Sequence, residues 1–161
     1  MIKIFTTGGT IDKVYFDAKS EYMVGAPQIN SILTESLFQP AYEVEEVLQK
    51  DSLEITDDDR KLIRSRIEAD DSSQILITHG TDTMVETARA LKGISGKVIV
   101  LVGSLSPARF KGSDAEFNIG FAMGALQSLP FGVYIAMNGR IFLPEDVRKN
   151  RAANRFENLD N

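Results

Sequence analysis

Hydroxyl groups and a carboxylate lie close together in the sequence THGTDTM, residues 78–84. Thr81 and Asp82 come soon after the apolar run 75–77, where a predicted strand gives way to a predicted helix. That position lets side chains and backbone N–H groups point at one reacting carbonyl group. The motif therefore indicates attack on a carbonyl group, although Asp82 could equally serve only as a helix cap.

A hydroxyl group is a weak nucleophile until a base takes its proton, so a base must lie near the reacting hydroxyl. Three side chains are candidates: Tyr22, the single histidine His79, and Lys149, the last as a buried lysine. The structural alternatives are an exposed aromatic for Tyr22 and a surface charge for Lys149. The residues alone leave this choice open.

A second polar loop, TTGGTI at residues 6–11, follows the first apolar run of the chain. Gly8 and Gly9 would allow a ligand to approach the backbone closely and would leave Thr10 at the mouth of a site. The same glycines could form a tight turn without a ligand. Neither G-x-G-x-x-G nor G-x-x-x-x-G-K-[ST] occurs in the sequence, so phosphate binding has no support.

Short β-rich runs alternate with stretches of helical period, which is typical of an α/β domain. We predict a single-domain, three-layer α/β/α fold with a mainly parallel, flavodoxin-like sheet. Ligands bind such sheets at the carboxyl ends of the strands. This places the loops at 6–11, 78–84 and 103–114 at the expected site. The predicted strands span residues 2–6, 43–48, 74–78, 97–102 and 132–137.

Four helices are expected between these strands. One covers residues 57–69 after a Thr56 cap, and another covers 82–91. A third begins after a Ser113 and Glu116 capping box, and Pro27 suits the first turn of the fourth. The apolar positions expected to face the core are Leu62, Ile63, Ile67, Val85, Ala88, Leu91, Phe117, Phe121 and Gly124.

Two segments do not fit the alternating pattern. Residues 8–25 are long and polar without an obvious element, which fits a mobile lid. The tail, residues 145–161, could form a short helix but has too few apolar residues to join the core. Its arginines and Lys149 make it basic, and we expect a solvated or partner-docking end.

Composition excludes several classes of function. The chain has 161 residues, no cysteine and one histidine, which excludes disulfides, thiolate nucleophiles and histidine-rich metal centres. The net charge of -5 argues against a nucleic-acid partner. The sequence has no apolar stretch near 18 residues and no signal-peptide core, so we expect no membrane association and a cytoplasmic location.

Five motifs, in this order and spacing, resemble the N-terminal domain of the bacterial-type L-asparaginase family: TTGGTI, YMVG, DSLEIT, THGTDTM and DVRKN. The resemblance covers essentially the whole chain, residues 1–161, and we expect a short, single-domain member. It implies an amidohydrolase that converts L-asparagine to L-aspartate and ammonia through an acyl-enzyme, without metal or cofactor.

The resemblance also implies roles for individual residues. Thr10 matches the nucleophile and Tyr22 the lid tyrosine beside it. Thr81, Asp82 and Lys149 match a second catalytic group. Ser52 matches the serine that holds the substrate's α-carboxylate, while Asp82 also meets the α-ammonium. His79 matches no catalytic role, so we expect a structural or hydrogen-bonding one. The residues expected to bind substrate are Gly9, Asp51, Ser52, Gly80, Thr81 and Asp82.

Two departures from the family pattern have consequences. Leu53 stands where many members have a polar residue, and the usual chain is about twice as long, with a second domain that helps to complete a neighbouring site. We therefore expect a homo-oligomer, a dimer or tetramer, in which another copy closes the pocket. The alternatives are an amino-acid-binding module without catalysis, or a related amidohydrolase such as a glutaminase or one component of an amidotransferase.

Overall fold

A six-stranded sheet forms the centre of the protein in a computed structural model that describes residues 1–159. The strands lie in the order β4-β1-β5-β6-β7-β8. All neighbouring pairs are parallel except β7 and β8. The bounds are β1 Ile2–Gly8, β4 Tyr42–Lys50, β5 Gln74–Thr78, β6 Val98–Val102, β7 Gly132–Met137 and β8 Arg140–Phe142.

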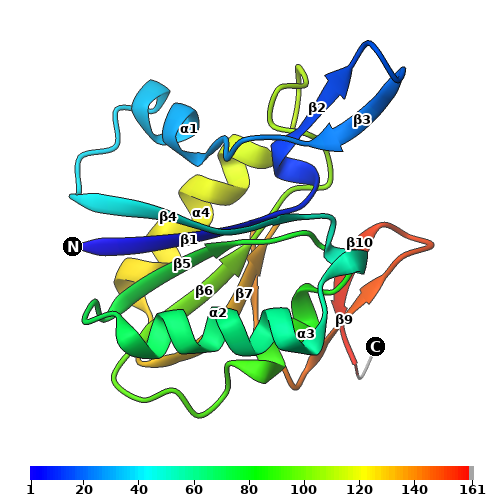
Figure 1. The fold of residues 1–161 in the computed structure, drawn as a ribbon. Coiled ribbons are helices and arrows are strands. Elements are labelled where there is room, and N and C mark those ends of the chain that lie inside the picture. The colour runs from blue at the N-terminus through cyan, green and yellow to red at the C-terminus, as the bar shows by residue number, and fades with distance from the viewer. Residues whose placement is uncertain (160–161) are drawn as a thin grey trace.

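Helices cover both faces of this sheet. In Figure 1 the sheet is seen nearly edge-on, with α1 and α4 on one side and α2 and α3 on the other. The three-layer α/β/α prediction is therefore confirmed. The bounds are α1 Ile29–Glu35, α2 Asp57–Ala69, α3 Met84–Ala90 and α4 Ala115–Ser128, with short 3-10 turns η1 Thr10–Asp12 and η2 Ser52–Glu54.

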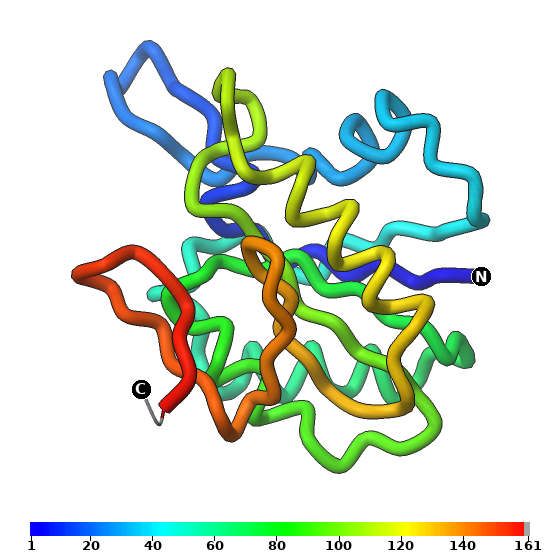
Figure 2. The backbone as a smooth tube through the Cα atoms, turned by 180° about the vertical axis from the view of Figure 1, so that it is seen from behind, coloured from blue at the N-terminus to red at the C-terminus, as the bar shows by residue number. Residues whose placement is uncertain are grey.

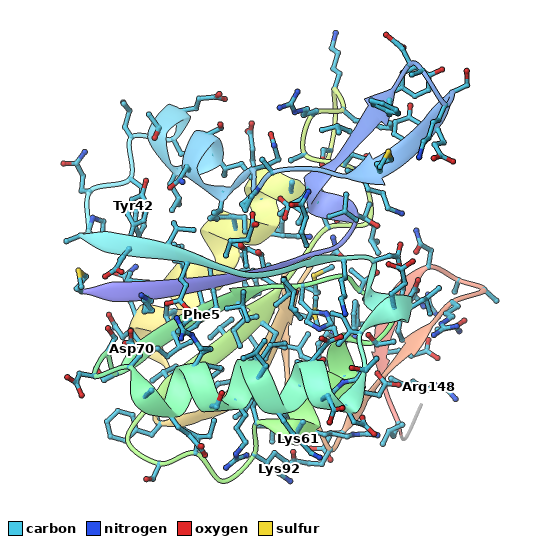
Figure 3. The ribbon with its side chains drawn as sticks, viewed as in Figure 1. Phe5, Tyr42, Lys61, Asp70, Lys92 and Arg148 are labelled. Carbon is cyan, nitrogen blue, oxygen red and sulfur yellow. The ribbon has the colours of Figure 1, made fainter. Side chains whose placement is uncertain are left out.

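The two central strands β5 and β6 are apolar almost throughout, because helices cover them on both sides. Phe5 of β1 lies between the sheet and α2, as Figure 3 shows, whereas Lys61 lies on the outer side of that helix. The hydrophobic core is continuous across both faces. It holds the carboxyl ends of the strands, and hence their loops, in fixed positions.

Counted along the chain, the five parallel strands have the spatial order second, first, third, fourth, fifth. This is the flavodoxin-like order that was predicted, and the chain direction across the sheet reverses between β1 and β5. The loop 9–12 leaves β1 and the loop 79–83 leaves β5. These two loops therefore flank the place where open α/β sheets bind ligands.

The helix boundaries correct several expectations. The Thr56 capping box of α2 is present, with Asp59 as its partner, but Leu62 is exposed while Ile63 and Ile67 are buried. Helix α1 begins at Ile29, so Pro27 lies outside it. Helix α3 begins only at Met84, because the Asp82 carboxylate pairs with a lysine instead of capping the helix.

Helix α4 also begins differently from the prediction. Its first residue follows Asp114, and no Ser113–Glu116 capping box forms. The Ser113 hydroxyl instead accepts a hydrogen bond from the N–H of Ala115 at 3.0 Å. Phe117, expected to face the core, is exposed on this helix and stacks beside Phe121.

Both irregular segments contain β-hairpins that were not predicted. Residues 8–25 contain the strands β2 Lys13–Phe16 and β3 Glu21–Val24, which pair with each other. The tail contains β9 Val147–Asn150 and β10 Arg155–Asn158 in place of a helix. Val147 and Phe156 are buried in the core, so the prediction that the tail stays outside it was wrong. Residues 160–161 of the predicted tail lie outside the described residues.

The described residues contain no helix that is both long and apolar enough to cross a membrane.

Candidate functional site

Three loops touch at the carboxyl edge of the sheet through residues with little or no side chain. A Cβ added to Gly9 would collide with the backbone of Gly80, and one added to Gly80 would lie 2.5 Å from the Cβ of Ser52. Gly9 has a φ of +93°, which glycine adopts without strain. Its N–H donates to the carbonyl of Lys50 at 2.9 Å. The predicted substrate residues Gly9, Gly80 and Ser52 are therefore in one place.

The three residues of the predicted second catalytic group are in direct contact. The Nζ of Lys149 lies 2.6 Å from Thr81 Oγ1 and 2.6 Å from Asp82 Oδ1. The Lys149 side chain is only 9% exposed, against 31% for Asp82. Charge-assisted hydrogen bonds of this length are among the stronger contacts in proteins. They fix the Thr81 hydroxyl beside a positive and a negative charge.

The tail hairpin β9–β10 carries Lys149 to this position from 67 residues away in sequence. Phe156 pairs with Lys149 across the hairpin and packs near Phe142, with ring centroids 6.3 Å apart. Burial raises the pKa of Glu157, but hydrogen bonds from Arg148, Arg155 and Asn150 hold it below its usual value overall. Glu157 thus ties the two strands together, with Arg148 of β9, labelled in Figure 3, as its partner across the hairpin.

His79 is fully buried and acts as a structural link. Its Nδ1 lies 2.7 Å from the carbonyl of Gly80, and its Nε2 lies 2.8 Å from Thr87 Oγ1. Because Arg60 Nε donates to the same Thr87 oxygen, that hydroxyl can give its own proton to Nε2. Burial lowers the pKa of His79 to about 4, so the ring is neutral at pH 7. The ring thereby fixes the carbonyl of Gly80.

The loop 103–114 supports the other two loops from the side. A Cβ on Gly103 would collide with the carbonyl of His79, so these backbones touch. The N–H of Ala108 donates to the carbonyl of Ile11 at 3.1 Å. Asp114 accepts hydrogen bonds from the N–H groups of Leu105 and Ser106, which hold the loop in place.

Thr10 in η1 and Tyr22 on β3 are at the same end of the sheet, and no hydrogen bond joins their side chains among residues 1–159. Thr10 is half-buried at the start of η1. Tyr22 is 52% exposed on β3, and its ring packs on Tyr15 and Phe110 with centroid distances of 5.4 Å each. Figures 1 and 2 show the β2–β3 hairpin projecting from the body at the end that also carries β9–β10.

An open groove of about 480 Å³ lies beside this edge. Lys13 and Asp51 form an ion pair in its wall, with Nζ 3.3 Å from Oδ2. Asp51 also accepts a hydrogen bond from the N–H of Leu53, whose side chain is exposed. The groove is lined by Lys13, Tyr22, Met23, Val24, Gln49, Asp51, Leu53 and Glu54. Asp51, which was predicted to bind substrate, therefore lines this groove together with Tyr22.

Several residues that shape the site were not predicted from the sequence as site residues. Thr83 Oγ1 donates to the carbonyl of Ser52 at 2.6 Å, so it joins the loops after β4 and β5. Thr87 orients the buried ring of His79. Asp12 is buried in the turn that begins with Thr10, although an aspartate in a polar loop ordinarily indicates an exposed position.

Comparison with known proteins identifies relatives along the full length of the described chain. The family model "Asparaginase, N-terminal" matches residues 1–159. The chain is 31% identical to the glutaminase-asparaginase of Acinetobacter glutaminasificans, over 92% of this chain and 49% of that protein. It is 34% identical to a subunit of the glutamyl-tRNA(Gln) amidotransferase of Saccharolobus islandicus, over 81% of this chain and 31% of that one.

Among solved structures, the fold is similar to that of the thermostable L-asparaginase from Thermococcus kodakarensis. The TM-score is 0.84 at 28% identity, and the match covers 99% of this chain and 51% of that one. The chain spans about half the length of the asparaginases that it matches.

Proposed function

The chain belongs to the asparaginase family, and we propose that it hydrolyses L-asparagine to L-aspartate and ammonia through a threonine acyl-enzyme. One observation carries this proposal. Lys149 Nζ lies 2.6 Å from both Thr81 Oγ1 and Asp82 Oδ1, next to the place where Gly9, Gly80 and Ser52 meet. The ammonium group of Lys149 is thus held against a hydroxyl group and a carboxylate at once, which is an arrangement that can tune the Thr81 hydroxyl.

In the proposed first step, Thr10 Oγ1 attacks the side-chain amide carbon of asparagine. The hydroxyl proton passes to the leaving nitrogen, the C–N bond breaks, and ammonia departs. The product is a β-aspartyl ester on Thr10. Tyr22 belongs to the hairpin that closes over this step, because exclusion of bulk water protects the intermediate and strengthens electrostatic contacts.

In the second step, water attacks the ester carbon and the bond between that carbon and Thr10 Oγ1 breaks. One proton of the water passes to Thr10 Oγ1, which regenerates the hydroxyl group and releases L-aspartate. Thr81 polarises this water, while Lys149 and Asp82 set the charge around the Thr81 hydroxyl. The half-buried Asp82 carboxylate also receives the α-ammonium group of the substrate. Ser52 and neighbouring backbone N–H groups, including that of Gly80, donate hydrogen bonds to the α-carboxylate, so the two charged ends are held a few ångströms apart.

Glutamine is the second candidate substrate. The relative from Acinetobacter glutaminasificans is named a glutaminase-asparaginase, and the groove beside Asp51 is open rather than closed. One extra methylene group changes binding in an apolar pocket by only about 1 to 3 kcal/mol. We therefore expect glutamine to be hydrolysed more slowly than asparagine, by a factor of roughly 10 to 200.

We also propose that a second copy of the chain closes the site, giving a dimer or tetramer. The exposure of Tyr22 and Leu53 at the rim supports this proposal, because large apolar side chains gathered at a site favour a covering partner. Light scattering during turnover tests it, and a fully active monomer would contradict it. The cytoplasmic location stays a prediction.

Ammonia release by the purified chain tests the proposed activity. Asparagine and glutamine are compared for wild type, Thr10→Ala and Thr81→Ala, with Thr34→Ala as a matched control on the exposed side of α1. We expect both site variants to lose activity and Thr34→Ala to keep it. Binding of asparagine without ammonia release by wild type would favour the non-catalytic binding module. Release from glutamine alone would favour a glutaminase or amidotransferase role.

A further inference from the structure

The carboxyl group of Asp12 is buried where the β2–β3 hairpin joins the body of the protein. The residue is 2% exposed. Its Oδ1 accepts a hydrogen bond from the N–H of Gln28 at 2.8 Å. Its Oδ2 is buried and has no hydrogen-bond partner among residues 1–159. A buried oxygen without a partner is costly, so it requires an explanation.

The backbone of Asp12 holds both ends of the hairpin. Its carbonyl accepts from the N–H of Gly25 at 2.8 Å, directly after β3, while Lys13 begins β2. Its own N–H donates to the carbonyl of Gly9 at 3.1 Å, in the turn that contains Thr10. Asp12 therefore joins three parts of the chain: the turn that contains Thr10, the β2–β3 hairpin and the start of α1.

Ionisation changes the energy of this junction. A neutral carboxyl group suits a buried position, whereas a carboxylate at the same place has a single N–H donor and one uncompensated oxygen. Opening the turn would let water reach that oxygen. The packed junction thus favours the protonated group, and a loosened junction favours the ionised one.

We propose that Asp12 is a positioning residue, whose carboxyl group holds the base of the β2–β3 hairpin against the Thr10 turn when protonated and loosens it when ionised. The proposal rests on the proposed function, in that the hairpin carries Tyr22 over Thr10. The pH range in which Asp12 changes its ionisation follows from the surroundings of its carboxyl group. Burial raises the pKa of Asp12 to about 7, against the effect of the Gln28 N–H, and Glu46 raises it further.

The charged groups nearby agree with this assignment. Glu46 comes from β4 and repels a negative charge on Asp12. Lys13 is engaged with Asp51 in an ion pair on the groove side. Arg109, from the loop 103–114, donates to the side-chain oxygen of Gln28 at 3.2 Å. Lys13 and Arg109 thus already have partners of their own.

Amide NMR of the full chain tests the structural half of the proposal without substrate. The signals of the Gln28 and Gly25 amides are followed from pH 5 to pH 9 in wild type, Asp12→Asn and Asp17→Asn. The Asp12→Asn side chain keeps an acceptor for Gln28 but cannot ionise, and Asp17 is an exposed control on the same hairpin. We expect both amides to titrate near pH 7 in wild type and Asp17→Asn only, with faster hydrogen exchange on the alkaline side after correction for the intrinsic pH dependence.

Enzyme kinetics test whether the ionisation of Asp12 affects the proposed reaction. The KM for L-asparagine should rise several-fold between pH 6 and pH 8.5 in wild type and Asp17→Asn, and stay nearly constant in Asp12→Asn, with kcat less affected. Absence of an amide titration, or the same KM profile in Asp12→Asn as in wild type, overturns the proposal. If the amides titrate but wild type releases no ammonia, the proposed function fails while the proton-dependent junction stands.

Discussion

Gly9 and Gly80 meet backbone to backbone, although 71 positions separate them in the sequence, and a methyl group on either would collide with a neighbouring loop. This contact joins the loops after β1 and β5 where the order of strands reverses. It brings the turn that begins with Thr10 next to the strand end that carries Thr81. The two threonine motifs therefore share one site because neither glycine has a side chain.

Gly80→Ala tests the tightness of this contact. Its Cβ would lie 2.5 Å from Ser52 Cβ, so a loop must move, and we expect a loss of about 1 to 3 kcal/mol in the free energy of unfolding. Activity should fall strongly. Gly120→Ala is the control, since its Cβ meets open space in the helix α4 and should stabilise by about 0.5 to 1 kcal/mol. Urea unfolding measures the stability of both variants. Equal effects of the two substitutions would contradict the tight contact at Gly80.

Lys149→Met tests the group that surrounds Thr81. It keeps the apolar stem but removes the ammonium that contacts Thr81 and Asp82. We expect kcat to fall by a factor of roughly 10² to 10⁴, as for loss of an acid–base group. Lys61→Met, on the exposed side of α2, should leave kcat unchanged. A folded Lys149→Met variant with wild-type kcat would exclude Lys149 from catalysis.

Phe156→Ala tests whether the core of the protein positions the tail hairpin. The side chain is buried and lies opposite Lys149 in the β9–β10 pair. We expect a loss of about 3 to 5 kcal/mol in the free energy of unfolding and a lower kcat through displacement of Lys149. Phe131→Ala removes an exposed ring as a control and should change neither quantity much. Thermal unfolding and ammonia release give the two readouts.

The pH dependence of stability tests the burial of Asp12 and His79, whose pKa values are shifted in opposite directions. Burial raises the pKa of Asp12 from 3.8 to about 7, so its contribution is present below pH 3.8 and is lost as pH rises to about 7. We expect Asp12→Asn to be more stable than wild type by about 2 to 4 kcal/mol at pH 8, and by little near pH 4. Urea unfolding of both proteins between pH 4 and pH 8 measures this difference. A difference in stability that does not change with pH would contradict the burial of the Asp12 carboxyl group.

His79 contributes a change of stability with pH that has the opposite sign to that of Asp12. Burial lowers its pKa from 6.5 to about 4, so its contribution is present above pH 6.5 and is lost as pH falls to about 4. In wild type the two slopes oppose each other between pH 4 and pH 6.5. The Asp12→Asn variant should therefore show the His79 slope without the opposing slope of Asp12, as a steady loss of stability on acidification through this window.

The sequence predicted the centre of the sheet well because β5 and β6 are apolar runs, buried on both faces, between polar loops. The parallel edge strand β4 was also predicted, although polar and apolar residues are mixed along it. The edge strand β8 and both hairpins were missed. Tyr15, Phe16 and Tyr22 lie on β2 and β3 without the burial that produces clear alternation. In the described part of the tail, Val147 and Phe156 are the hydrophobic residues that join the core, and their burial depends on contacts with distant elements.

The site was predicted in part for a similar reason. Thr81 and Asp82 stand in a recognisable motif, and Lys149 was one of three candidate bases that the resemblance then grouped with them. The direct contact among the three depends on the tail hairpin. Thr83, Thr87 and Asp12 act through burial and hydrogen bonds to groups on other loops and helices. Residue type does not reveal such partners, because they are set by tertiary structure.

Mass spectrometry of the protein, quenched with acid during turnover of L-asparagine, tests the central claim most directly. A variant with slow deacylation, Thr81→Ala, can be quenched alongside wild type to increase the intermediate. We predict one added aspartyl group on Thr10, found in the peptide that contains TTGGTI and absent from Thr10→Ala. An aspartyl group on another residue, or ammonia release by Thr10→Ala at the wild-type rate, would contradict Thr10 as the nucleophile.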